Sequence, residues 1–411
     1  MKVSDITQKN TKERILEAAF SFFSEPFYKD FSLSDLAAKV GITKTAIYRH
    51  FKNKDAVVAA MRSHFFDLLS VRLREFQNAR LSSDEELIKV PFVETILFFT
   101  QNPQFINYFM SQFSIDANFD ETIRAEMLSR GIESDNFTDR YGKKNFEKSF
   151  FGGFTILFFI KARTRILAAQ NCQNFDSDEK FAQHLVNFIL KGFRGTTELG
   201  EILYPVEITD ERRQKLDRIS ILSKDVFLEE NRVFDALATV IDKYSFCGVT
   251  IERIADELGM AKSSLYFYFE NKNQLIKKLI EKEFAVLATV LWENTAEARN
   301  YSEFVYISLV TCISYYIARP SIVPVSGWLL QNVTEDPFKG CFDVNNIWEK
   351  QMEHPLVHPE FGFPIVPELI TFWCTTFPAA LSSYGKKHQM TAEEVMESIK
   401  KIFVYIQQGI Q

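Results

Sequence analysis

A short run of cationic and hydroxyl-bearing residues near the N-terminus has the composition of a surface that binds nucleic acid. The run extends from Thr43 to Lys54 and contains four cationic residues but no acidic one. The whole chain of 411 residues has a net charge of −6, so it cannot bind nucleic acid over its entire surface. Binding would have to come from a local basic patch, formed by Lys44, Arg49, Lys52 and Lys54.

The spacing within this run separates an inner from an outer helix face. At about 100° per residue, Ile47 and Phe51 point together toward a core. Arginine can hold guanine through two hydrogen bonds, and threonine can touch a base or a thymine methyl. Tyrosine and lysine reach phosphates, so the outer face predicts contact with a DNA groove. That outer face would carry Thr45, Tyr48, Arg49 and Lys52.

Capping residues predict the short helices that would hold this face in place. Ser32 can cap a second helix together with Asp35, as a variant of the capping box. Gly41 would end that helix, because the tight turn favours a residue that accepts positive φ. Thr43 would cap the third helix and Asn53 a fourth. Two small helices joined by a short turn with glycine are the signature of a helix-turn-helix.

An amphipathic helix is expected ahead of these two, from about Thr11 to Ser24. Its apolar face is predicted to hold Ile15, Ala18, Ala19, Phe22 and Phe23. The second helix would add Leu33, Leu36, Ala37 and Val40 to the same core.

The same pattern occurs again in the second half of the chain. Residues 31–54 match residues 249–272 without a gap, at an offset of 218 (249 − 31). Seven of the 24 positions are identical, and most of the others are conservative. Because this offset is about half of the chain length, it predicts two near-equal halves. The identities are Ala37/Ala255, Gly41/Gly259, Lys44/Lys262, Tyr48/Tyr266, Phe51/Phe269, Asn53/Asn271 and Lys54/Lys272.

The predicted fold class is all-α, with two tandem units that each begin with a three-helix helix-turn-helix domain and continue as a helical regulatory bundle. Few glycines and prolines, 15 and 12 residues, favour long helices over a sheet protein. A charged stretch from Asp210 to Glu230 is expected to be helical, and the prolines between 320 and 367 predict short helices and loops there. The expected boundaries are 1–60 for the first DNA-binding domain, 61–204 for the first regulatory domain, 205–222 for the linker, 223–282 for the second DNA-binding domain and 283–411 for the second regulatory domain.

The two repeated stretches resemble the N-terminal domain of tetracycline-repressor-like (TetR family) regulators. The family motif, Tyr-x-[His/Tyr]-Phe-x-Asn-Lys, stands at residues 48–54 and 266–272, and an aromatic residue precedes the second helix at Tyr28 and Phe246. The resemblance covers about 50 residues in each half. Two departures are visible: the usual glycine before that aromatic is Phe27 or Ser245, and the cap before the second recognition helix is Ala261.

The candidate DNA-binding residues follow from the outer faces and from this resemblance. The second copy replaces Arg49 with Phe267 and Lys52 with Glu270, so its charge from Ala261 to Lys272 is only +1, against +4 in the first copy. This difference predicts a second half-site of different sequence and thus an asymmetric operator; a second module that is only a structural relic is the alternative. The candidates are Thr43, Lys44, Thr45, Tyr48, Arg49, His50 and Lys54 in the first copy and Lys262, Ser263, Tyr266, Phe267, Tyr268 and Lys272 in the second.

The resemblance implies a transcriptional regulator, more often a repressor, that binds double-stranded operator DNA as a pair of modules. Family members are typically homodimers that pair through their last long helices. Here the covalent repeat predicts an intramolecular pseudo-dimer. The helices near 150–167 and 180–191 would pack on those near 367–384 and 392–407.

The resemblance also implies a small-molecule effector. The aromatic stretches Phe105–Met110 and Ser314–Ile317, with Trp328, could line a pocket for an apolar or planar ligand, or they could simply form the core. An interaction or ligand-sensing protein with a degenerate helix-turn-helix is the alternative function.

Other chemistry finds little support in the sequence. His354 and His358 have the spacing of a metal pair, but Pro355 and Pro359 argue against the helix that would join them. Neither a phosphate loop nor a hydrolase or metalloprotease motif occurs, so neither an enzyme nor a cofactor is expected. The five cysteines include no CxxC, and the longest apolar run, residues 150–160, is too short to span a membrane. A cytoplasmic protein without a membrane segment is therefore expected.

Overall fold

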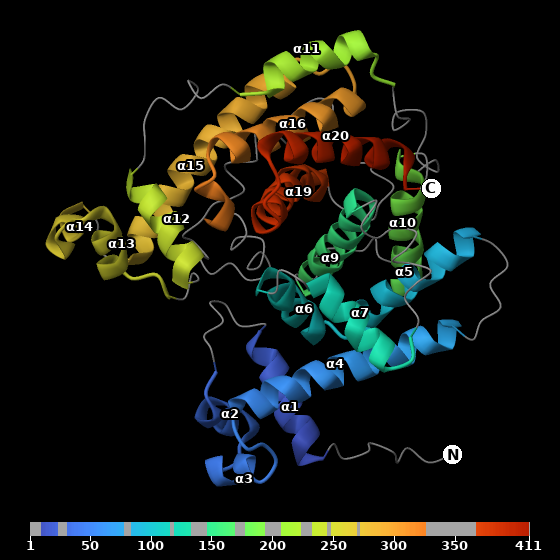
Figure 1. The fold of residues 1–411 in the computed structure, drawn as a ribbon, viewed down its shortest axis with the longest axis vertical. Helices are drawn as coiled ribbons and strands as arrows, with labels where there is room; N and C mark the ends of the chain where they lie inside the picture. Colours follow the sequence, from blue (N-terminus) through green and yellow to red (C-terminus); the bar gives the residue numbers. More distant parts are fainter. Residues whose placement is uncertain are drawn as a thin grey trace. The chain divides into compact units, whose positions relative to one another are not determined.

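The computed structural model describes two compact units, Met1–Asn136 and Phe137–Gln411, and the elements of each are drawn in Figure 1. Within the described parts of the chain every regular element is a helix, as the all-α prediction requires. The described residues are 10–23, 31–77, 84–115, 119–132, 146–168, 177–193, 207–222, 232–244, 248–268, 272–325 and 367–410.

The first unit begins with three short helices, α1 (Thr11–Phe22), α2 (Leu33–Val40) and α3 (Lys44–Tyr48). Helix α1 packs on α2, on the long α4 (Lys54–Gln77) and on α6 (Gln104–Ile115), and α4 also packs on α5 (Asp84–Gln101) and α7 (Phe119–Ser129). These contacts join the first three helices to the rest of the unit through one shared core.

The inner face of α1 differs from the prediction. Ile15 and Ala19 are buried as expected, but Leu16 and Phe20 complete the face, while Ala18, Phe22 and Phe23 are only half-buried. Phe20 is selected because its ring meets Phe105 edge-on at 4.7 Å and Tyr108 at 5.1 Å. Phe22 instead stacks on Phe31 at 5.3 Å, on the side toward α2.

The second unit contains the last two long helices of the first half and the whole described second half. It consists of α9 (Phe146–Ala168), α10 (Asp178–Lys191), α11 (Asp210–Ser220), α12 (Arg232–Tyr244), α13 (Ile251–Leu258), α14 (Lys262–Tyr268), α15 (Lys272–Thr295), α16 (Tyr301–Ala318), α19 (Pro367–Lys387) and α20 (Ala392–Gln408). Helix α16 is at its centre, in contact with α11, α15, α19 and α20 (Figure 1). Every residue from 302 to 316 is buried.

The repeat of the sequence extends into the helices beyond the DNA-binding modules. Helix α4 and helix α15 begin and end 218 residues apart, and α5 and α16 keep the same offset within one residue. The ends of α9 and α19, and of α10 and α20, keep it within four residues. The two halves therefore share one helix order over most of their length.

Helices α9 and α10 pack against α19 and α20 of the other half. Trp373 of α19 lies among Phe151, Phe159 and Phe188, with ring centroids 6.2 Å away in each case. At the edges of this bundle Lys401 Nζ lies 2.9 Å from Glu147 Oε1, and Lys148 Nζ donates to the Ile410 carbonyl at 2.6 Å.

The C-terminal ends of α10 and α20 cross at a pair of glycines. Gly192 and Gly409 occupy matching places in the two halves, and both have positive φ, 58° and 82°. A Cβ on Gly192 would lie 2.5 Å from the Gln407 carbonyl carbon, and one on Gly409 would collide with the Leu190 backbone. The Ile410 N–H donates to the Ile189 carbonyl at 3.1 Å, so the two backbones touch directly.

The stretch predicted as a linker contributes helix α11 to the second unit. Helix α11 ends at Ser220, shorter than the predicted Asp210–Glu230 stretch, because Ile221 is already extended; residues 223–230 lie outside the described chain. Arg212 bonds Glu303 of α16 at 2.8 Å, and Asp217 accepts from Tyr306 at 2.7 Å. Asp217 also pairs with Lys400 of α20 at 2.9 Å, so α11 is fixed on both helices.

Two further observations concern a membrane span and a metal site. None of the described helices is long and apolar enough to cross a membrane. The described residues also contain no cluster of His, Cys, Asp and Glu that could hold a metal ion, and His354 and His358 lie outside the described chain.

Candidate nucleic-acid interface

Local capping fixes the start of the first helix-turn-helix. The Ser32 N–H donates to Asp35 Oδ2 at 2.9 Å, and the Asp35 N–H donates to Ser32 Oγ at 3.2 Å, which is the predicted reciprocal box. The Ser32 hydroxyl also donates to Asp35 Oδ2, at 2.7 Å. The hydroxyl and N–H of Ser32, which both donate to this carboxylate, hold the pKa of Asp35 below its usual value. Gly41 ends α2 in the left-handed region at φ 74°, and the Ile42 N–H closes the turn on the Ala37 carbonyl at 3.0 Å.

The recognition helix α3 is shorter than predicted. Thr43 caps it as expected, with the Ala46 N–H donating to Thr43 Oγ1 at 3.2 Å, but the helix ends at Tyr48. Arg49 and His50 therefore lie in the following turn, and Lys52 lies in a bend. The helix stops because Phe51, which is 4% exposed, turns back into the core and Asn53 then caps α4.

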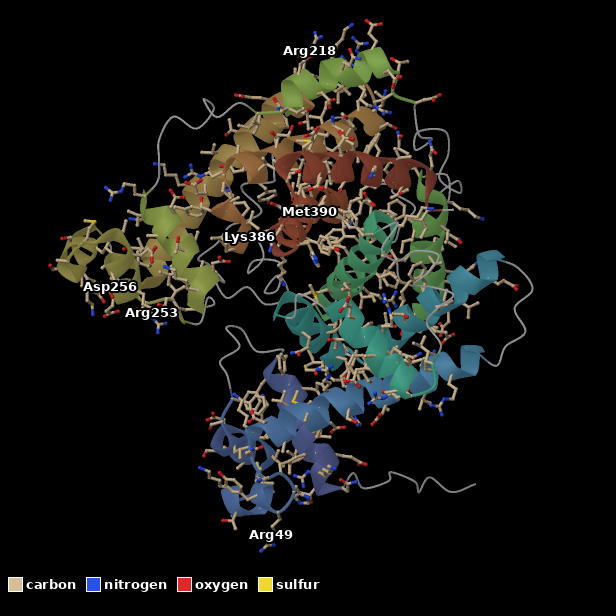
Figure 2. All side chains as sticks on the ribbon, viewed as in Figure 1. Arg49, Arg218, Arg253, Asp256, Lys386 and Met390 are labelled. Atoms are coloured by element: carbon tan, nitrogen blue, oxygen red, sulfur yellow. The ribbon has the colours of Figure 1, made fainter. Side chains whose placement is uncertain are left out.

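The first module nevertheless presents nearly all its candidate residues on its outside. Ile47 is fully buried, whereas Tyr48 is 50% exposed. Figure 2 shows the Arg49 side chain directed away from the helices of the module. Lys54 is half-buried, with its Nζ 5.3 Å from the centre of the Phe31 ring. The exposed candidates are Thr43, Lys44, Thr45, Tyr48, Arg49 and His50.

The second module repeats the frame with different side chains. Thr250 replaces Ser32 as the cap, and the Arg253 N–H donates to Thr250 Oγ1 at 3.2 Å. Gly259 replaces Gly41, at φ 63°. Ala261 offers only its carbonyl to α14, and it accepts from the Ser264 N–H at 2.9 Å. Because Arg253 also stands where the first module has Asp35, the same frame is built with two capping side chains fewer.

Three of the six second-module candidates can be placed on its outer face. Lys262, Ser263 and Tyr266 are exposed, and Leu265 between them is buried. Phe267 and Tyr268 belong to α14 and Lys272 begins α15, but their side chains lie outside the described part of the chain.

The sequence reasoning missed the ion pairs of the second module. Lys262 pairs with Glu252 of α13, and Lys243 of α12 pairs with Glu257 at 2.8 Å. Arg253 lies over the Tyr244 ring at 4.2 Å, and Figure 2 marks it on α13 beside Asp256. Lys262 and Glu252 are ten residues apart on different helices, so helix periodicity does not predict their contact.

Most of the predicted effector-lining residues lie in closely packed core. Phe105 and Tyr108 are buried against Phe20 and Phe65, and burial raises the pKa of Tyr108 to about 12. The Tyr315 and Tyr316 hydroxyls donate to backbone carbonyls, and Trp328 lies outside the described residues. A role in binding a ligand stays a prediction.

Comparison with known proteins identifies the two modules. The family of bacterial regulatory proteins named tetR matches residues 15–61 and again 233–279. A stretch of 63 residues is 38% identical to TtgW of Pseudomonas putida, an uncharacterized HTH-type transcriptional regulator, and covers 15% of this chain and 47% of that protein. The match thus spans about half the length of this relative. The chain therefore carries, in tandem, two copies of the N-terminal helix-turn-helix domain of the tetR family of bacterial regulatory proteins.

Proposed function

We propose that this chain binds an asymmetric operator through both modules and represses transcription as a single-chain pseudo-dimer. The observation that carries the proposal is the packing of α9 and α10 on α19 and α20. Family members pair through their last long helices, and here those helices come from the two halves of one chain. The glycine crossing at Gly192 and Gly409 supports this pairing, because each backbone closely approaches the other.

The outer faces of α3 and α14 support DNA as the partner. Tyr48 and Tyr266 are 50% and 45% exposed, although large aromatic side chains usually contribute to a core. A phenol on the outer face of a recognition helix can donate to a DNA phosphate. Two such faces in one chain would read two half-sites about 34–36 Å apart, one turn of DNA.

Different side chains at the base-reading positions support an asymmetric operator. Arg49 in the first module can hold guanine, whereas its counterpart Phe267 can make only apolar contacts, such as with a thymine methyl. An apolar or planar effector would bind in the helical regulatory regions, in the first unit near the aromatic residues of α6 or in the second unit near those of α16. The chain would act in the cytoplasm and carry out no catalysis.

Two matched substitutions test the proposal, Tyr48→Ala and Tyr266→Ala. Each removes one exposed phenol, and both are compared with the wild type on an operator selected from random duplexes and on unselected duplex. Each variant is expected to bind the selected duplex about tenfold more weakly. If only Tyr48→Ala loses affinity for the selected duplex, the DNA-binding site is limited to the first module. If neither variant loses affinity, the chain is better explained as an interaction protein. Recovery of a perfect inverted repeat would contradict the asymmetric operator.

A further inference from the structure

A carboxylate lies against the recognition helix of the second module. Glu252 is the second residue of α13, and its Oε1 forms an ion pair with Lys262 Nζ at the start of α14. Both side chains are about half exposed, 51% and 47%, so the pair lies on the outside of the module. The partners hold the pKa of Glu252 below and that of Lys262 above its usual value, so both stay charged at neutral pH.

The first module has the same lysine without the carboxylate. Lys262 corresponds to Lys44, which is one of the seven identities of the repeat, whereas Glu252 corresponds to Ser34. Ser34 is exposed and carries no charge. Helix α2 as a whole has no net charge, one lysine against one aspartate, while α13 has −2, one arginine against two glutamates and one aspartate.

This carboxylate opposes DNA binding in two ways. It is a fixed negative charge at the N-terminal end of α13, where a helix otherwise favours an approaching phosphate. It also forms an ion pair with Lys262, so a phosphate must displace Glu252 before this lysine can contribute to DNA binding. The ion pair itself is exposed and contributes little to stability, so its removal leaves the fold intact.

We propose that Glu252 acts as a built-in brake on DNA binding by the second module, in which its carboxylate takes the place of a DNA phosphate at Lys262. This inference rests on the proposed function of the second module. The first module, which lacks the brake, then supplies most of the affinity. The second engages once the chain is anchored and adds sequence discrimination.

The decisive variant is Glu252→Ser, which installs the residue of the first module. Binding to a short random-sequence duplex and to the selected operator is measured across a salt titration. The variant is expected to bind about three- to tenfold more tightly, and the slope of log K against log salt becomes steeper by about 0.9, the value for one added phosphate contact. The gain should vanish in Glu252→Ser/Lys262→Ala compared with Lys262→Ala.

Two controls separate the brake from a general charge effect. Glu257→Ser removes an equal charge and an equal kind of ion pair, with Lys243, from the other side of α13 and is expected to change affinity less than twofold. The reciprocal Ser34→Glu should weaken binding by the first module about as much as Glu252→Ser strengthens binding by the second. Unchanged affinity in Glu252→Ser, or an equal gain in Glu257→Ser, would overturn the proposal.

The same assay distinguishes failure of the brake from failure of the proposed function. If Tyr266→Ala weakens binding but Glu252→Ser changes nothing, the second module binds DNA without a brake. If Tyr266→Ala has no effect in the wild type but abolishes a gain seen in Glu252→Ser, the brake exists and keeps the second module off DNA altogether.

Discussion

The two DNA-binding modules share a backbone frame but differ in the carboxylates that lie near their lysines. The first presents Lys44 and Arg49 on a recognition surface with no carboxylate between Thr43 and Lys54. The second pairs Lys262 with Glu252 and Lys243 with Glu257. The N-cap of the second helix and the turn glycine after it recur in both modules, so the frame depends on a few positions with strict local chemistry. The exposed positions between them are free to change the charge and, with it, the affinity for DNA.

The same contrast appears deeper in the molecule, at the long helix that follows each module. In α4 one position is occupied by Phe65, which packs against Phe98 and Phe105 in an aromatic cluster. The matching position of α15 is Glu283, a buried carboxylate that accepts from Arg319 at 2.7 Å. One frame thus tolerates either a purely apolar centre or a buried ion pair at equivalent sites.

The largest expected effect comes from breaking the buried pair. Glu283→Ala leaves Arg319, whose side chain is 11% exposed, without the Glu283 carboxylate and is expected to destabilise the second unit by about 3–5 kcal/mol. Urea unfolding followed by tryptophan fluorescence measures this loss, because all four tryptophans belong to the second half.

The matched control replaces both residues of the ion pair with the corresponding residues of the first half. Glu283→Phe/Arg319→Asn installs the residues that stand at Phe65 and at Asn102, which follows the end of α5 as Arg319 follows the end of α16. The double variant is expected to recover at least half of the lost stability, since uncharged residues can replace a buried pair at little cost. A double variant as unstable as Glu283→Ala would show that the two centres are not interchangeable.

Local chemistry predicted the frame of the modules well. Ser32, Gly41, Thr43 and Asn53 play their expected roles because a cap or a left-handed turn depends on residues within a few positions. The face of α1 was predicted wrongly in part, since both of its candidate faces are apolar and the choice depends on the distant Phe105. The Glu252 pair could not be predicted, because only the folded turn brings Lys262 to it.

Substitution of the turn glycines tests whether the backbone frames of the two modules are equivalent in stability. Nothing lies within 4 Å of a Cβ built on Gly41 or Gly259, so only their positive φ resists a side chain. Gly41→Ala and Gly259→Ala are each expected to destabilise their module by about 1–2 kcal/mol. In each variant, native-state hydrogen exchange of α2 and of α13 measures the loss of stability in the substituted module beside the unsubstituted module. Losses that differ by more than twofold would contradict an equivalent frame.

Substitution in the capping box of α2 is expected to have the smallest effect on stability. It should also reveal a difference in acid sensitivity between α2 and α13. The pKa of Asp35 is lower in the folded protein than its ordinary 3.8, so its stabilisation is present above that pH and is lost as the pH falls through the folded value. The third helical position of the second module is Arg253, which cannot supply such a carboxylate. Asp35→Asn is expected to remove this acid dependence from α2 and to leave α13 unchanged. Hydrogen exchange between pH 5 and 3 tests this, and an unaltered profile would assign the acid response to other groups.

The number of chains on one operator tests the central claim most directly. Sedimentation of the protein with the selected duplex gives the mass of the complex, and footprinting of the same sample gives the protected bases. The account predicts one chain per duplex, with two protected half-sites of different sequence about one helical turn apart. Two chains on one operator, each contributing the same module to identical half-sites, would contradict it.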